Sequence, residues 1–302
     1  MYELIIIGAG PSGITASVYA ARKRLNFIVL TKDIGGQSAW SGEIENYTGY
    51  QFITGPELAQ KFEEHVRKYN VEIREGEEVI RVKRDNDGIE VVSNKGVYKA
   101  KTVIISSGKR SRELNVPGEK EFKNRGLTYC ATCDGLIFSE KKVAVIGGGN
   151  SALDAGLQMA RIAQKIYLVN ISSQITGDKI MLEKLMKYNN VEILNNRQVL
   201  AILGEKMVKG IKIKDLSLGK EDILGVEGVF VEIGLIPNSE FALDVEKNQF
   251  GEIKVNCLNE TNIPGIFSAG DVTNIPEKQI IIASGEGAKA CLSAFRYLST
   301  QK

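Results

Sequence analysis

The chain has 302 residues, of which 43% are hydrophobic and 25% charged, a balance typical of a globular protein large enough for two domains. Its 39 lysines and arginines nearly match its 37 acidic residues, so no net charge recruits nucleic acid or an anionic membrane. No segment approaches the roughly 18 to 20 unbroken apolar residues of a membrane helix, and no basic region precedes the N-terminal apolar run as in a signal peptide. We therefore expect a cytoplasmic protein with neither a nucleic-acid nor a membrane partner.

The first predicted element is a strand that leads through a glycine turn into an alanine-rich helix, in the sequence YELIIIGAGPSGITASVYAARK. Gly8, Gly10 and Gly13 give the spacing GxGxxG. Glycines at this spacing permit a tight turn and close approach of the backbone to a pyrophosphate, which the N–H groups of the helix N-terminus then bind. The opening of the chain is therefore predicted to be a dinucleotide site.

The same pattern returns from residue 142 in KVAVIGGGNSALDAGLQMARIA, where Gly147, Gly149 and Ala152 give GxGxxA. Two copies predict an α/β fold with two nested Rossmann-like domains. After the next strand an acid usually holds a ribose diol, and an arginine accommodates a 2′-phosphate. These two strands end instead at Thr31 and Asn170, which carry neither charge.

A third piece, TNIPGIFSAGDVTN, is predicted to run a strand into Gly270 and Asp271, ahead of a C-terminal helix. A carboxylate there can hold a ribityl hydroxyl of a flavin, although Asp271 could also be a helix N-cap. Beside the N-terminal fingerprint we favour the flavin role. The first domain is then discontinuous, with residues 1–111 and 243–302 forming an FAD-binding domain around an NAD(P)H-type domain at 112–242.

Two cysteines three residues apart, Cys130 and Cys133, stand just ahead of the second glycine motif. A zinc site needs two further Cys or His ligands, and His65, Cys257 and Cys291 are not spaced as a second pair. We therefore expect no metal. In a reducing compartment a lone CxxC is more often a redox or metal motif than a structural staple.

With these residues in place, the chain resembles the low-molecular-weight thioredoxin reductases and the flavin core of the alkyl hydroperoxide reductase flavoprotein. The resemblance runs essentially end to end, through GAGPSG, GGQ, IENYTGY, SSG, VPGE, CATCDG, GGGNSA and FSAGD. It implies a redox-active Cys130–Cys133 disulfide in which Cys133 faces the FAD and Cys130 attacks the disulfide of a partner. It also implies that Asp134 donates and accepts the proton that thiol–disulfide exchange requires.

The resemblance further implies cofactor contacts in both domains, a rotation of one domain against the other, and a homodimer. FAD contacts are expected at Gly8, Gly10, Pro11, Ser12, Gly13, Gly36, Gln37, Asn46, Val79, Ser107, Gly108, Gly270, Asp271, Lys278, Gln279 and Ile280. Pyridine-nucleotide contacts are expected at Gly147, Gly149, Asn150, Ser151, Ala152 and Asn170.

The resemblance identifies the electron donor less directly, because residues 170–176, NISSQIT, lack the arginines of the NADPH-dependent members. They also lack the glutamate that the peroxide-reductase flavoprotein has at the position of Asn170. NADPH is therefore disfavoured, NADH is possible, and a reduced ferredoxin stays open as a donor. The chain begins at the glycine-rich strand, so the acceptor is expected to be a separate thioredoxin- or glutaredoxin-like protein.

Two other classes of function fit the same scaffold. A flavin oxidase or a ferredoxin–NAD(P) reductase would not need a CxxC, and CATCDG weighs against both. A flavin- or nucleotide-binding protein without enzymatic activity would fit the altered stretch at 170–176, whereas the retained GGGNSA weighs against it.

Overall fold

The computed structural model describes residues 1–40, 43–44 and 46–300, apart from the side chains at positions 40, 43, 132 and 133. It divides the chain into two compact units, Met1–Arg110 with Ile236–Lys302 and Ser111–Leu235. The sequence places these boundaries at 111/112 and 242/243. In the segments that join the units, strands β9 (Lys109–Ser111) and β18 (Leu235–Pro237) pair with each other.

The first unit is built on a seven-stranded sheet in the order β5-β2-β1-β8-β7-β6, with β19 also paired to β8. Strands β5, β2, β1, β8 and β19 run parallel, while β6 and β7 form a hairpin that joins β8 antiparallel. The strands are β1 (Tyr2–Ala9), β2 (Phe27–Ile34), β5 (Ile73–Arg74), β6 (Val79–Asp85), β7 (Gly88–Ser93), β8 (Val97–Ile105) and β19 (Ile266–Ser268). A short pair, β3 (Glu43–Ile44) and β4 (Ile53–Thr54), lies outside this sheet.

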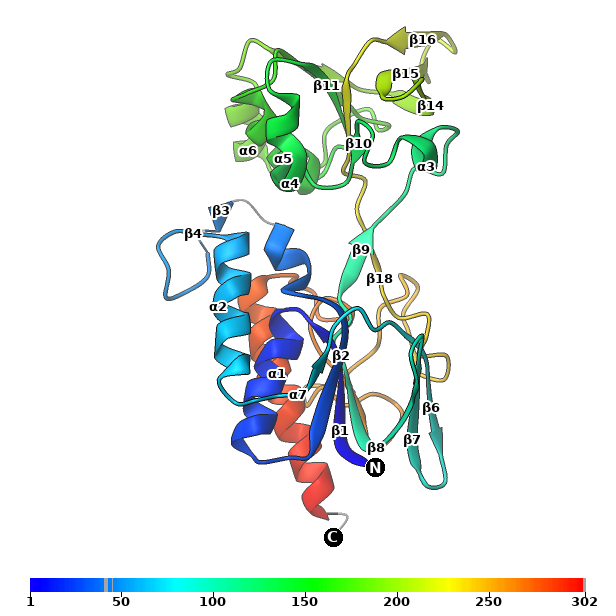
Figure 1. The fold of residues 1–302 in the computed structure, drawn as a ribbon. Coiled ribbons are helices and arrows are strands. Elements are labelled where there is room, and N and C mark those ends of the chain that lie inside the picture. The colour runs from blue at the N-terminus through cyan, green and yellow to red at the C-terminus, as the bar shows by residue number, and fades with distance from the viewer. Residues whose placement is uncertain (41–42, 45, 301–302) are drawn as a thin grey trace. The chain divides into compact units, whose positions relative to one another are not determined.

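Alternate residues of β1 point to opposite faces of this sheet, and helices cover one of these faces. Leu4 and Ile6 belong to the core that includes residues of the helices, whereas Ile5 and Ile7 belong to the core on the other face. Figure 1 shows the α-helices of this unit together on one side of the strands. The helical segments are α1 (Pro11–Arg22), η1 (Gly36–Trp40), α2 (Gly55–Arg67) and α7 (Ile280–Thr300).

The second unit has a five-stranded parallel sheet in the order β10-β17-β11-β12-β13 and an antiparallel sheet of three strands, β14-β15-β16. The strands are β10 (Leu127–Thr128), β11 (Lys142–Ile146), β12 (Lys165–Val169), β13 (Val191–Leu194), β14 (Arg197–Gly204), β15 (Val208–Asp215), β16 (Glu221–Leu224) and β17 (Gly228–Val231). The helical segments are α3 (Glu119–Phe122), α4 (Ala131–Asp134), η2 (Gly135–Phe138), α5 (Asn150–Ala160) and α6 (Lys179–Leu185). Helix α5 packs on both α4 and α6, as Figure 1 shows.

The predicted α/β class with two Rossmann-like parallel sheets is confirmed. The sequence did not predict that the β6–β7 hairpin extends the first sheet. No helix of the described chain is both long and apolar enough to cross a bilayer.

Candidate functional site

The first glycine turn joins β1 to α1, and two of its glycines are required by the protein's own packing. Gly8 has φ +101°, and a Cβ there would lie 2.4 Å from the carbonyl oxygen of Ser106. A Cβ on Gly13 would lie 1.9 Å from the carbonyl oxygen of Gly8. At both positions the backbone of the strand, the turn and the helix packs too closely to admit a side chain, as the predicted fingerprint requires.

Gly10 differs, because nothing in its own fold demands a glycine. Its φ is −74°, and the nearest heavy atom to an added Cβ would be the carbonyl oxygen of Gly35, 3.9 Å away. Gly10 is the N-cap of α1, and no side chain in the described ranges caps it. The first N–H groups of α1 are thus available to an anion, and the space over Gly10 suits a pyrophosphate.

Segments distant in sequence converge on this turn. A Cβ on Gly36 would lie 3.3 Å from Cα of Gly10, and a Cβ on Gly270 would lie 2.6 Å from Oγ of Ser12. The side chain of Asn46 donates from Nδ2 to Oε1 of Gln279 at 3.0 Å. The stretches around Gly36 and Gly270 therefore lie against the turn, and Asn46 and Gln279 join two further predicted segments.

A cluster of charged side chains lies beside Asp271. Burial raises the pKa of Asp271, although Lys278 and Lys109 oppose that rise. Both lysines pair with one carboxylate, that of Glu252, at 2.9 Å from Nζ of Lys109 and 3.2 Å from Nζ of Lys278. The sequence analysis included Lys278 but missed Lys109 and Glu252, which stand in no recognisable motif.

The positions of the other predicted flavin residues say less about a bound ligand. Gln37 donates from Nε2 to the carbonyl oxygen of Lys109 at 2.7 Å. Ser107 donates to the carbonyl oxygen of Asn238, and Val79 is buried in the core, so its side chain is not available to a ligand. Pro11 and Ile280 are the first residues of α1 and α7, and Gly108 has φ +64° with no described atom near its Cβ position.

The second glycine turn, between β11 and α5, repeats the geometry of the first. Gly147 has φ +141°, and its Cβ would lie 3.1 Å from Cβ of Ala152, where the helix packs on the strand. Gly149 is the N-cap of α5, with φ −92° and no described atom within 4 Å of an added Cβ. No described side chain caps α5, so Asn150 and Ser151 begin a helix whose first N–H groups are open to an anion.

Asn170 follows β12 on one side of this turn, and its side chain is engaged by its own loop and by Asn195. Nδ2 donates to the carbonyl oxygens of Ser172 and Gln174 and to Oδ1 of Asn195, all within 3.0 Å. Oδ1 accepts the N–H of Ser172 at 3.3 Å, and the residue is 3% exposed. Asn170 thus stabilises loop 170–176, and its amide has no donor left for the ribose contact that the sequence analysis assigned to it.

The cysteine motif lies in the same unit, at the start of α4. Cys130 is held in a disulfide, while Cys257 and Cys291 are free thiols. The side chain of Cys133 lies outside the described part of the chain. Asp134 ends α4, and its N–H donates to the carbonyl oxygen of Cys130 at 3.3 Å.

Thr128, which the sequence analysis missed, links the two ends of this motif. Its hydroxyl donates to Oδ2 of Asp134 and accepts the N–H of Cys130 at 3.1 Å. Next to it, the hydroxyl of Tyr129 donates to buried Glu119 at 2.8 Å, and burial followed by this bond raises the pKa of Tyr129. The hydroxyl in TYC, two residues before the first cysteine, is the signal that could have identified Thr128.

Comparison with known proteins agrees with a chain that carries two glycine turns and a cysteine pair. The family profile described as pyridine nucleotide-disulphide oxidoreductase matches residues 2–287. The chain belongs to the pyridine nucleotide-disulphide oxidoreductase family. Within the family, its fold is of the thioredoxin reductase type.

Solved structures of this type are similar over the whole chain. Thioredoxin reductase from Lactococcus lactis has a TM-score of 0.92 and 32% identity, covering 99% of this chain and 100% of its own. The enzyme from T. acidophilum has a TM-score of 0.89 and 37% identity, covering 100% and 99%. A ferredoxin-flavin thioredoxin reductase from Clostridium acetobutylicum has a TM-score of 0.55 and 31% identity, covering 99% and 98%.

Among curated proteins, an alkyl hydroperoxide reductase component of Staphylococcus aureus is 40% identical over 299 residues, covering 98% of this chain and 59% of its own length. The corresponding protein of Pseudomonas putida is 41% identical over 302 residues, covering 98% and 58%. The chain thus spans about three-fifths of the length of these curated relatives.

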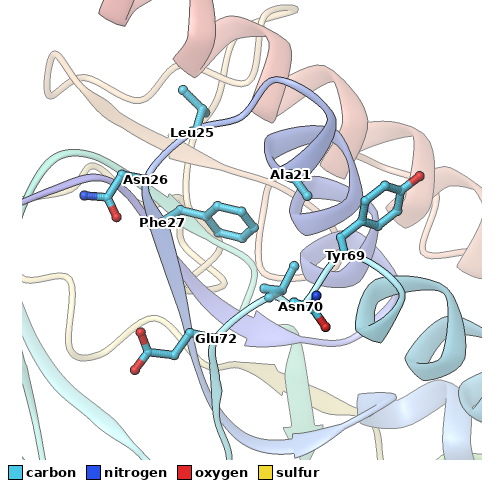
Figure 2. A pocket seen from close by; sticks show the side chains of 8 residues that line it. Ala21, Leu25, Asn26, Phe27, Tyr69, Asn70 and Glu72 are labelled. Atoms are coloured by element: carbon cyan, nitrogen blue, oxygen red, sulfur yellow. The ribbon is translucent and has the colours of Figure 1, made fainter.

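Members of the pyridine nucleotide-disulphide oxidoreductase family bind FAD and a pyridine nucleotide. Both glycine turns of this member fit such ligands, because each leaves a helix N-terminus uncapped by any described side chain and open space over its middle glycine. A surface pocket lined by residues such as Phe27, Tyr69 and Glu72 lies elsewhere, at the end of α1 away from its glycine turn (Figure 2). It includes none of the predicted site residues.

Proposed function

We propose that this chain is an FAD-dependent disulfide reductase that takes electrons from NADH and passes them through Cys130 and Cys133 to a thioredoxin- or glutaredoxin-like protein. The observation that carries the proposal is the disulfide of Cys130 beside a carboxylate, that of Asp134, which Thr128 holds in place. Bound FAD would supply the two-electron carrier between the nucleotide and the disulfide.

The chain's own residues would manage the proton and sulfur chemistry. The Cys130–Cys133 disulfide takes two electrons and two protons to become a dithiol. The thiolate of Cys130 then attacks the partner's disulfide, and Cys133 closes on Cys130 to release the partner as a dithiol. Asp134, at the end of the short helix that begins directly after Cys130, would carry protons to and from these sulfurs.

The flavin would lie on the first unit. We propose that its pyrophosphate binds at the N-terminus of α1 over Gly10 and that Asp271 binds its ribityl chain. Lys109 and Lys278 pair with Glu252 close to that carboxylate and fix its surroundings.

NADH is preferred over NADPH because residues 170–176 contain no lysine or arginine to bind a 2′-phosphate. A ferredoxin is the second candidate, supported by the 31% identity to the ferredoxin-flavin thioredoxin reductase. The alkyl hydroperoxide reductase relatives support a thioredoxin-like acceptor less specifically, since the chain spans only part of their length. A homodimer remains part of the proposal.

An anaerobic titration of the flavin-loaded protein tests the donor. We expect NADH to bleach the flavin absorbance rapidly and NADPH to act slowly. Bleaching by reduced ferredoxin alone would contradict the NADH proposal and support the second candidate.

Cysteine variants test the path to the acceptor. We expect Cys130→Ser and Cys133→Ser to abolish reduction of a thioredoxin while the flavin is still bleached by the donor. Cys257→Ser removes an exposed free thiol and is the matched control, with unchanged turnover. Full turnover by either motif variant would show that the disulfide is not on the path.

A further inference from the structure

Glu232 lies at the edge of the second glycine turn and has no role in the function proposed above. It follows β17 directly, and its N–H donates to the carbonyl oxygen of Ile146 at 2.8 Å. Its own carbonyl oxygen would lie 2.1 Å from a Cβ on Gly147. The backbone of Glu232 is therefore packed against the turn that the dinucleotide is expected to approach.

The carboxyl group of Glu232 points toward the start of α5. It is hydrogen-bonded to the side chain of Ser151, the second residue of that helix. Burial, followed by the nearby carboxylate of Asp154 on the same helix, raises the pKa of Glu232 to about 8. Among the described residues, no lysine or arginine contributes to this shift. The group is thus a neutral acid at pH 7, half-buried beside an uncapped helix N-terminus.

Sheet order places Glu232 and Asn170 on opposite sides of the turn. Strand β11 lies between β12 and β17 in the sheet. From β11 the chain continues to β12 and β13 on one side, and it later returns to β17, between β11 and β10, on the other side. In such sheets a dinucleotide crosses the carboxyl ends of the strands where the order reverses, with its adenosine half on the β12 side. Glu232, after β17, then faces the pyrophosphate and the nicotinamide half.

We propose that Glu232 is a binding residue for the nicotinamide half of the dinucleotide, which it contacts as a neutral carboxylic acid, and that loss of its proton weakens binding. The inference rests on the proposed function, because it requires that this unit bind NADH. A pyrophosphate at the N-terminus of α5 would place negative charge beside Ser151, and Asp154 already supplies one on the same helix. An ionised Glu232 would add a further negative charge next to the ligand and repel it.

The sign of the pH effect follows from linkage. A ligand that binds the protonated protein raises the pKa of Glu232 further, so binding is unaffected well below pH 8 and weakens above it. If Glu232 loses its proton with a pKa of about 8, the dissociation constant of the dinucleotide should increase about tenfold between pH 7 and pH 9.

Calorimetric titration of the oxidised, FAD-loaded protein with NAD⁺ tests the inference, because NAD⁺ has no group that titrates between pH 7 and pH 9. We expect the tenfold weakening in the parent protein and a change of less than about twofold in Glu232→Gln, which keeps a neutral hydrogen-bonding side chain. Glu227→Gln, exposed at the other end of β17, is the matched control and should keep the parent profile.

A second measurement does not depend on any variant. Titrations at pH 8.5 in two buffers of different ionisation enthalpy should show proton uptake by the parent protein as NAD⁺ binds. A role confined to holding Ser151 would give no uptake.

The outcomes separate the two proposals. Binding of NAD⁺ with the same pH profile in the parent and in Glu232→Gln, or without proton uptake, would overturn this inference and leave the NADH proposal standing. Absence of NAD⁺ binding to the parent protein at every pH would overturn both.

Discussion

Thr128 donates its hydroxyl to the carboxylate of Asp134 while it accepts the backbone N–H of Cys130. One buried side chain thereby fixes the position of the carboxylate relative to the redox cysteine. Thr128 acts through Asp134 and Cys130, so it is a positioning residue.

Thr128→Val, which replaces the hydroxyl by a methyl group of similar size, should lower the rate of protein-disulfide reduction by about ten- to a hundredfold, the scale of one misplaced acid–base group. Reduction of the flavin by the donor should stay at the parent rate, because that step does not use Asp134. Rapid-mixing experiments measure the two half-reactions separately. Thr128→Ser keeps the hydroxyl and should restore most of the activity, whereas equal losses in the Val and Ser variants would argue against positioning.

Gly10→Ala and Gly13→Ala separate a glycine required by the ligand from one required by the fold. An added Cβ at Gly10 has open space, so Gly10→Ala should fold with the parent melting temperature when flavin is removed, yet bind FAD at least about tenfold more weakly. At Gly13 the same methyl group would lie 1.9 Å from the carbonyl oxygen of Gly8, so Gly13→Ala should unfold at lower temperature with or without flavin. Calorimetry measures the melting temperatures of the two variants, and their flavin content reports how well they bind FAD. Parent affinity for FAD in Gly10→Ala would refute the assignment of that space to the pyrophosphate.

Glu252 should make the first unit sensitive to acid. Burial alone would raise the pKa of Glu252, but hydrogen bonds from Lys109, Asn248 and Lys278 outweigh it and hold the pKa below the ordinary value of 4.5. A lowered carboxylate pKa means that the stabilisation is present above pH 4.5 and is lost as the pH falls through the folded-state value.

Glu252→Gln should therefore lower the free energy of unfolding at pH 7 by about 2 to 4 kcal/mol, because it removes the carboxylate with which both half-buried lysines pair. The difference from the parent should shrink toward acid pH. Denaturant unfolding at pH 7 and pH 3 measures both values. Glu246→Gln breaks an exposed pair with Lys254 and serves as the control, with an effect of less than about 1 kcal/mol. A constant difference at both pH values would contradict this account.

Much of the fold followed from local sequence. The two glycine turns could be predicted because Gly8 and Gly147, with positive φ, and the small residues Gly13 and Ala152 stand at a fixed short spacing that is visible in the sequence. The carbonyl groups that exclude a Cβ at Gly8 and Gly147 belong to Ser106 and Glu232, which are distant in the chain. The hairpin of β6 and β7 was not predicted to join the first sheet, because strand pairing depends on partners that a local pattern does not identify.

The sequence by itself determined the α/β class, the two nucleotide-binding fingerprints and the cysteine pair, since each is a short pattern with its own backbone or chemical requirement. The tertiary structure decided how the remaining polar groups are used. It engaged the Asn170 amide in its own loop, gathered Lys109 and Lys278 around Glu252, and set Glu232 beside Ser151. Hydrogen bonds and pKa shifts of this kind depend on which distant segments meet and how far they exclude water, and no spacing along the chain specifies either.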